Sequence, residues 1–253
     1  MGLPARACLL LTICAVFALA QGAQNNDVQN TAAGTVRLHQ TWGPKGSAPG
    51  TSLELREVSR SGPEVVFRLF AHGVDPDGAY SLVAWPVSQK GPSTVVKGVT
   101  LGSGGLAICP GRPDTCGSAA KPNDPVEIKL TPIAGEPVRL ALISANNQVR
   151  VFAKTVPNPI RGKDRSCALE AVLLTPGAEL VLLEGEGFAP NTEVTMSSAS
   201  GGESHSQTAK VGADGKYLGA LLPFTAKATS GVAAVTLKGV GCAPAVKVNW
   251  GRR

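Results

Sequence analysis

The chain has 253 residues and a formal net charge of +6, from 24 Lys and Arg against 18 Asp and Glu. With 43% hydrophobic residues it is not mainly disordered, and because the small positive excess is spread along the chain, we expect no dedicated nucleic-acid partner. The 30 Gly and 19 Pro follow no collagen period, and Val, Thr and Leu fill the stretches between them, which is typical of an all-β protein.

Residues 1–20 are predicted to be a secretory signal peptide. One positive charge, Arg6, precedes a mostly apolar run over residues 7–20 that is short for a membrane span. Ala18 and Ala20 provide a small-x-small cleavage signal, and the alternative is an uncleaved N-terminal anchor. No second apolar run approaches spanning length, and no N-x-S/T sequon occurs. We therefore expect a secreted or periplasmic bacterial protein, without a membrane span in its mature part.

Four cysteines follow the predicted signal peptide, and three pairings can join them. We predict the bridges Cys109–Cys116 and Cys167–Cys242. Residues 110–115 contain turn-forming Pro, Gly and Asp, so the first bridge is expected to pin a local loop. The second would close a loop of 74 intervening residues and, on the chain-entropy model, contribute roughly 4 to 5 kcal/mol to stability. Neither pair has the cysteine spacing of zinc sites and no histidine is near them, so we expect no metal and no cofactor.

Residues 21–34 are rich in Gln, Asn and Ala without periodicity, and we expect a disordered leader there. From residue 35 onward, apolar and polar residues alternate with the period of two that indicates half-buried strands. Turn sequences that contain Gly or Pro separate these segments. The clearest alternating segments are 53–56, 65–69, 126–131, 138–142 and 149–151.

Residues 157–166 interrupt this alternation with two prolines and four charges, as an interdomain linker would. After the linker, seven short strands separated by turn signals are predicted, which is the pattern of a seven-strand sandwich. The predicted strands cover residues 168–174, 179–185, 193–198, 206–211, 216–222, 232–238 and 245–250.

The two halves of the chain resemble each other. Residues 65–77 align with residues 179–191 at an offset of 114, and strand, glycine, apolar residue and proline recur in the same order. The offset shrinks further along because the first half carries an insertion around Cys109 and Cys116. We therefore interpret residues 35–156 and 167–253 as two diverged copies of one sandwich.

Three turn motifs of the second half carry a family resemblance: residues 185–192, residues 214–217, and Gly231 before a closing Val-rich strand. Over about 80 residues, this stretch resembles bacterial immunoglobulin-like domains of the IPT/TIG-like type, which occur in extracellular proteins. The first half matches them only loosely. The resemblance implies a module for adhesion, for spacing or as an appendage, and it brings no shared catalytic residues. The predicted fold class is all-β, with two immunoglobulin-like antiparallel β-sandwiches in tandem.

No enzymatic activity is expected, because each candidate motif has a plainer explanation. Ser118 and Lys121 fit the S-x-x-K pattern of serine acyltransferases, but a proline follows at once and the accompanying motifs are missing. Residues 75–78 resemble the start of a calcium loop without its downstream glutamate, so a turn is expected there. The three histidines of the chain have no convincing nucleophile or ligand partner in the sequence.

Carbohydrate binding is the main alternative to protein binding, because exposed aromatic rings on a β-sandwich can stack on sugars. The candidate rings are the three tryptophans, Trp42, Trp85 and Trp250. Trp250 ends an alternating strand and is expected in the core. Trp42 lies outside any clear strand and is the best candidate for an exposed ring.

The loop of residues 109–116 is the best candidate for a binding site. The predicted disulfide would make this loop rigid, and the loop carries Arg112 and Asp114. Alternatively, the bridge only pins the insertion. We expect a secreted, non-catalytic binding, adhesion or assembly protein of the cell envelope, whose partner is an unknown protein or envelope polymer. A carbohydrate-binding module and a structural spacer without a specific ligand are the alternatives.

Overall fold

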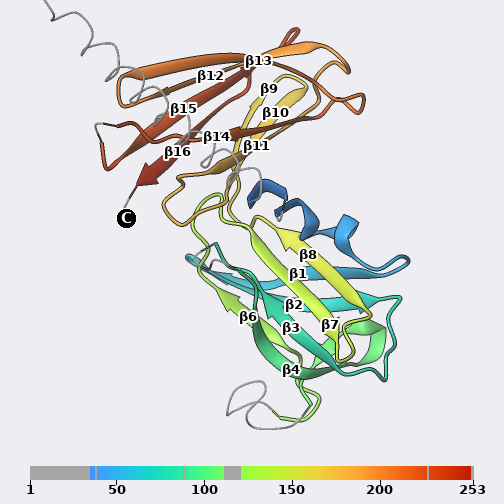
Figure 1. The fold of residues 1–253 in the computed structure, drawn as a ribbon. Coiled ribbons are helices and arrows are strands. Elements are labelled where there is room, and N and C mark those ends of the chain that lie inside the picture. Colours follow the sequence, from blue (N-terminus) through green and yellow to red (C-terminus); the bar gives the residue numbers. More distant parts are fainter. Residues whose placement is uncertain are drawn as a thin grey trace, which may run out of the picture.

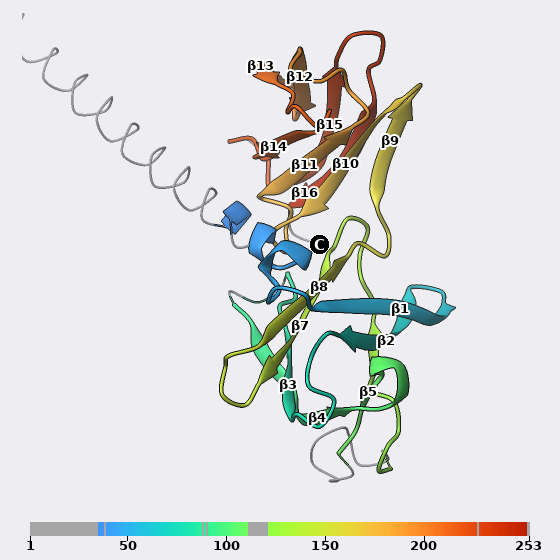
Figure 2. The same cartoon turned by 90° about the vertical axis from the view of Figure 1, so that its right-hand side faces the viewer.

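The computed structural model describes residues 35–37, 39–87, 89, 91–110, 121–226 and 228–251. Within these residues, sixteen strands form four antiparallel sheets, which confirms the all-β prediction. Figures 1 and 2 show the sheets in two groups, one from each half of the chain, with the described N-terminal segment between them. Two short 3-10 helices, η1 (Pro44–Gly46) and η2 (Ser103–Gly105), interrupt the loops.

The first half contributes eight strands to two sheets. Their bounds are β1 Ser52–Ser61, β2 Glu64–His72, β3 Tyr80–Ala84, β4 Ser93–Leu101, β5 Ala107–Ile108, β6 Glu127–Leu130, β7 Val138–Ser144 and β8 Arg150–Thr155. One sheet has the order β1-β2-β6 and the other the order β5-β4-β3-β7-β8.

These two sheets share one buried core. Val65, Phe67 and Leu69 of β2 face it, as the alternation in the sequence predicted, and Leu82 of β3 and Leu140 of β7 meet them from the other sheet. Each of the five alternating segments predicted in the first half therefore lies within a strand or overlaps one. β3 and β4 were not predicted from the sequence, although both belong to this core.

The second half also contributes eight strands. Their bounds are β9 Ile160–Asp164, β10 Cys167–Leu173, β11 Val181–Glu186, β12 Glu193–Ser200, β13 Glu203–Lys210, β14 Tyr217–Leu221, β15 Ser230–Lys238 and β16 Ala245–Gly251. One sheet has the order β9-β10-β11-β14 and the other the order β13-β12-β15-β16. All seven predicted strands are present as β10 to β16.

The linker prediction is wrong over residues 160–164, because these form strand β9 and pair antiparallel with β10. Prolines and alternating charges are typical of an edge strand, where one row of backbone groups needs no partner. Ile160 packs against the core, whereas Arg161 and Lys163 are exposed on the other face. The alternation is therefore present in β9, but it covers only five residues beside the prolines.

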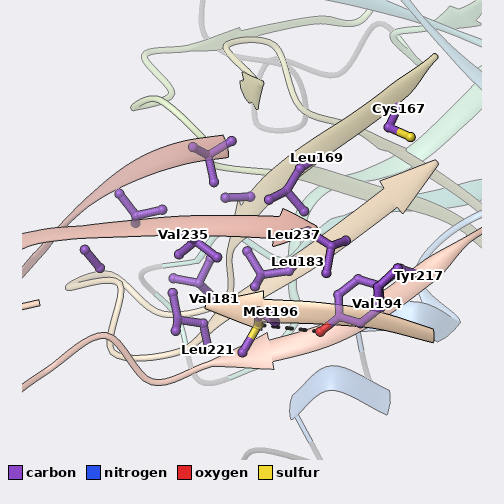
Figure 3. Close-up of a cluster of buried hydrophobic side chains, with 14 of the residues drawn as sticks. Cys167, Leu169, Val181, Leu183, Val194, Met196, Tyr217, Leu221, Val235 and Leu237 are labelled. Atoms are coloured by element: carbon purple, nitrogen blue, oxygen red, sulfur yellow. Dashed lines mark hydrogen bonds between the residues drawn. The ribbon is translucent and has the colours of Figure 1, made fainter. Parts of the chain in front are cut away.

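The core of the second half lies between its two sheets (Figure 3). Leu169 of β10 and Leu183 of β11 come from one sheet, and Val194 of β12 and Leu237 of β15 come from the other. The buried Tyr217 of β14 reaches across the core, with its hydroxyl 3.5 Å from the sulfur of Met196. Two antiparallel sheets that bury one shared core have the arrangement of a β-sandwich.

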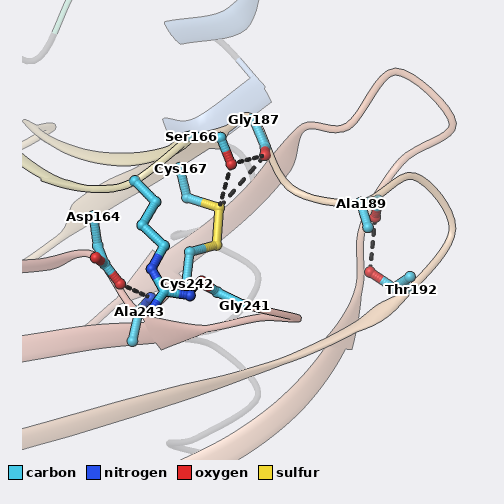
Figure 4. Close-up of a disulfide and its surroundings, with 10 residues drawn as sticks. Asp164, Ser166, Cys167, Gly187, Ala189, Thr192, Gly241, Cys242 and Ala243 are labelled. Carbon is cyan, nitrogen blue, oxygen red and sulfur yellow. Dashed lines mark hydrogen bonds between the residues drawn. A yellow bond between two sulfur atoms is a disulfide. The ribbon is translucent and has the colours of Figure 1, made fainter.

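One side of this sandwich is closed, where edge strands β9 and β16 meet. We call this the closed side. The predicted disulfide Cys167–Cys242 joins the start of β10 to the loop before β16, with a Cα–Cα distance of 6.1 Å (Figure 4). Asp164 accepts a hydrogen bond of 2.7 Å from the backbone N–H of Ala243. Gly162 lies so close to Ala245 that an added Cβ would overlap with the backbone of that residue.

The other side is open, and we call it the open side. Here β13 and β14 are the edge strands of the two sheets, and no ladder joins them within the described residues.

Candidate functional site

The candidate site lies on the outer face of the sheet β9-β10-β11-β14. In β10 the alternation directs Leu169 and Ala171 to the core and leaves Glu170 on the opposite face. The antiparallel register places Glu170 opposite Glu184 of β11. Opposed residues have Cβ atoms about 5 Å apart, so two carboxylates lie side by side. We call Glu170 and Glu184 the carboxylate pair.

The carboxylate pair forms no ion pair with the described cations of its own sheet. Arg161 of β9 is the register neighbour of Glu170, but its guanidinium forms an ion pair with Glu186 instead. In the described part of the chain, no cationic nitrogen lies within 4.0 Å of a carboxylate oxygen of Glu170 or Glu184. Burial raises the pKa of Glu170, and the negative charge of Glu184 raises it further.

The N-terminal segment and β8 contribute the opposite wall of the site. Lys154 of β8 donates a hydrogen bond of 3.0 Å to Nε2 of His39. His39 is fully buried, and burial, followed by the positive charges of Lys154 and Arg139, lowers its pKa to about 3. Burial lowers the pKa of Lys154 as well, while the charge of Glu184 acts in the opposite direction. Lys154 is therefore electrostatically coupled to the carboxylate pair without forming an ion pair with it.

These walls enclose a groove of about 710 Å³, which we call the charged groove. A groove of this size can receive a small molecule or a few side chains of a larger partner. Its floor is the outer face of the sheet, and exposed lysines stand at its rim. Its charged lining residues are Lys45, Lys154, Arg161, Glu170, Glu184, Glu186 and Lys216.

Trp42 is buried, so the prediction of an exposed ring is wrong. Its exposed fraction is 7%, and its ring packs edge-on against Trp85 and Phe152 with centroid distances of 5.8 and 5.2 Å. The N-terminal segment folds back over the outer face of β3, β7 and β8, where the guanidinium of Arg139 also covers Trp85 at 3.8 Å. Trp250 is in the core, as predicted. None of the three tryptophans offers a surface for stacking sugars.

The predicted loop site lies largely outside the described residues, which do not include Arg112, Asp114 or Cys116. Cys109 is described, buried and disulfide-bonded. Its pairing with Cys116 stays a prediction, and so does the role of the loop.

The other motifs of the sequence do not assemble a second site. Asp75 accepts a hydrogen bond of 3.0 Å from the backbone N–H of Asp77, which is the turn expected there, and Ser118 lies outside the described residues. His205 is exposed, 3.9 Å from Glu203. Within the described ranges, no group of three or more His, Cys, Asp or Glu side chains is placed to hold a metal ion. Nor does any described helix have the length and apolar character to cross a membrane.

The sequence analysis missed the carboxylate pair and Lys154. A signal was present for Glu170, which is the one charged residue of β10 among residues that are otherwise apolar on both faces. A carboxylate in such a strand needs a reason to be there, because burial of a charge is costly. The signal is weaker for Glu184, because β11 ends in a second carboxylate, Glu186. The pairing of the two could not be read from the sequence, because it depends on the register of β10 against β11.

Comparisons with known proteins add no identity. No protein-family model matches the chain, and no curated protein shows significant similarity to it.

Proposed function

We propose that the protein is an exported, non-catalytic binding protein whose charged groove receives a cationic group of its partner. The observation that carries this proposal is the carboxylate pair, side by side and half-buried without a counter-ion within 4.0 Å. Adjacent carboxylates that have lost water are costly to keep ionised together. An ammonium or guanidinium group of a partner would stabilise both through charge-assisted hydrogen bonds.

The rim lysines do not oppose such a ligand strongly. Lys45 and Lys216 are exposed, and water screens their repulsion of an incoming cation. Lys154 is held by its hydrogen bond to His39.

The placement of the two carboxylates favours binding over hydrolysis. Both project from the same face of one sheet and approach a ligand from the same direction. An acid and a base that hydrolyse a glycosidic bond stand instead on opposite sides of that bond.

The proposal also includes export from the cytosol and an immunoglobulin-like fold for both halves of the chain. The predicted signal peptide and the Cys167–Cys242 disulfide are typical of proteins that mature outside the cytosol. The turn motifs that resemble IPT/TIG-like domains support two immunoglobulin-like sandwiches, used for adhesion or assembly at a bacterial cell envelope. The buried tryptophans weigh against the carbohydrate-binding alternative.

The test is affinity capture with the oxidised, full-length protein as bait against a solubilised envelope fraction and a panel of insoluble polysaccharides. The variant Glu170→Gln/Glu184→Gln removes both charges at nearly constant volume. The control is Glu64→Gln, which removes one exposed charge on β2, a strand that does not line the groove.

We expect a protein that is retained by the wild type and by Glu64→Gln, and lost with the double variant. Retention of a polysaccharide instead would favour the carbohydrate-binding alternative. If nothing is retained, or if the double variant retains the same protein, the proposed role of the groove is wrong and a spacer becomes the better explanation.

A further inference from the structure

Strand β14 is an unprotected edge of its sheet. It pairs with β11 on one side, and no strand pairs with its other side within the described residues. Edge strands commonly carry a lysine, a proline or a bulge that prevents another strand from adding to them. β14 reads Tyr-Leu-Gly-Ala-Leu and pairs with β11 without a register shift, so it has none of these. The backbone N–H and C=O groups on this side form no ladder with another described strand, and they can pair with an additional one.

A second groove of about 740 Å³ surrounds this edge, and we call it the edge groove. On the outer side of the sheet it is apolar, lined by Val36, Leu182 and Leu222. On the inner side, between the two sheets, His205 and Gln207 line it together with the apolar Met196 and Leu221. A strand laid along β14 would therefore find an apolar surface under one of its faces and a mixed, partly polar one under the other.

The edge groove continues into the charged groove. Leu218 lines both, and 49% of its surface is exposed. Its register partner on β11 is Glu184, one member of the carboxylate pair. A strand added to β14 would lie about 10 Å from β11, two strand spacings away. A long basic side chain opposite Leu218 could reach across it toward Glu184.

We infer that β14 binds an extended segment of the partner protein by antiparallel strand addition, with a Lys or Arg near the C-terminal end of that segment. This inference rests on the proposed function and names the ligand of its site. Because the segment runs antiparallel to β14, its C-terminal end lies beside the charged groove. Its apolar side chains alternate with small polar ones, to match the two sides of the edge groove. Strand addition supplies affinity through main-chain hydrogen bonds, and the side-chain pockets supply specificity.

A second copy of this chain fits the site less well. If two β14 strands paired about Gly219, Lys216 of each would face Leu222 of the other, and Glu184 would gain no counter-ion. Bringing Lys216 opposite Leu218 would centre the pairing on Tyr217. Half of the ladder would then fall in the turn that precedes β14. Charge complementarity thus favours a basic segment of another protein.

The test is fluorescence anisotropy with the oxidised, full-length protein and two labelled peptides. One is acetyl-Thr-Val-Thr-Val-Thr-Val-Thr-Arg-amide, and the other has Glu in place of Arg. Leu218→Lys places a charge on the exposed edge. Val232→Lys is the matched control, because Val232 is 50% exposed on the other sheet. Analytical ultracentrifugation of each variant reports the oligomeric state.

We expect the Arg peptide to bind at least about tenfold more tightly than the Glu peptide, which corresponds to about 1.4 kcal/mol. Leu218→Lys should weaken its binding at least about tenfold, Val232→Lys should leave it unchanged, and Glu184→Gln should remove the preference for Arg. Glu184→Gln thereby separates the role of the charge from that of the strand edge.

Three results would overturn the inference: no saturable binding of the Arg peptide below about 1 mM, equal binding of both peptides, or a dimer that Leu218→Lys dissociates. The last result would assign the edge to a second copy. If peptide binding fails while capture of a partner still depends on the carboxylate pair, only the strand-addition inference falls. If both fail, the proposed function falls with it.

Discussion

The closed and open sides of the second-half sandwich differ in how their edge strands are covered. On the closed side, a disulfide, the Asp164 hydrogen bond and the close approach of Gly162 to Ala245 join β9 to β16. On the open side, β13 and β14 stay apart, and Leu218, Leu222 and the edge of β14 are left exposed.

Under the proposed function, this difference indicates that one side of the sandwich stabilises the fold and the other side binds a partner. An exposed apolar edge lowers solubility and promotes association, which is a cost unless the edge serves binding. Covalent and close-packed contacts on the closed side can keep the two sheets together while the open side presents the edge groove, which continues into the charged groove. If so, damage to the closed side should reduce stability, and damage to the open side should reduce binding.

The largest expected effect comes from removing the Cys167–Cys242 disulfide of the closed side. In the variant Cys167→Ala/Cys242→Ala, the free energy of unfolding should fall by about 4 kcal/mol, because the bridge closes a long loop with a sequence separation of 75. Urea denaturation followed by tryptophan fluorescence measures this change. Ser166→Ala, beside the bridge, is the control and should cost less than about 1 kcal/mol. A loss for the double variant as small as that of the control would show that the closed side does not depend on the disulfide.

The second effect concerns His39, which supports the wall of the charged groove. The folded-state pKa of about 3 lies below the ordinary 6.5, so the unfolded state binds more protons between these values. Stability should therefore fall as the pH is lowered from about 6.5 toward 3, by at most about 1.4 kcal/mol per pH unit. The faces around His39 carry Lys154 and Arg139, whose positive charges act in the same direction.

The variant His39→Gln keeps an acceptor for Lys154 but does not titrate. Its stability should depend less on pH over this window than that of the wild type, as measured by thermal unfolding at intervals between pH 4 and 7. Parallel pH profiles for the two proteins would mean that His39 is not buried in its neutral form.

A smaller effect tests the packing of the closed side. A Cβ at Gly162 would overlap with the backbone of Ala245, so Gly162→Ala should destabilise by about 2 kcal/mol. Gly91→Ala is the control, because a Cβ there meets no atom within 4 Å. It should change stability by less than about 1 kcal/mol in either direction. Equal behaviour of the two variants in urea denaturation would contradict the close approach of β9 to β16.

Much of the fold could be predicted from the sequence, because several strands alternate buried and exposed residues and turn sequences separate them. β12, β15 and β16 show this alternation, and turn sequences delimit the seven predicted strands β10 to β16. β9 was missed because prolines and charges surround a short edge strand. β3 was missed because it is central, with Leu82 buried on one face and Val83 on the other, so that its residues do not alternate.

Most of the candidate site could not be predicted from the sequence, because it depends on contacts between distant segments. The burial of Trp42 depends on the N-terminal segment folding back over β3, β7 and β8, which no local pattern contains. The carboxylate pair depends on strand register, and a shift of one residue would turn Glu184 to the core. Local periodicity predicts strands, whereas sites form where distant strands meet.

The smallest expected effect concerns the charged groove, where Glu170→Gln should stabilise the free protein. Because burial and the charge of Glu184 raise the pKa of Glu170, the folded state binds more protons than the unfolded state just above the ordinary pKa of 4.5. Wild-type stability therefore falls as the pH rises through this region, and the neutral Gln removes that loss. The half-exposed position limits the gain at pH 7 to about 0.5 kcal/mol. Thermal unfolding at pH 4 and pH 7 checks it, with Glu64→Gln as the control. A variant that gains stability but loses its partner would mark Glu170 as a residue kept for binding, whereas one that loses stability at pH 7 would show that the carboxylate serves the fold.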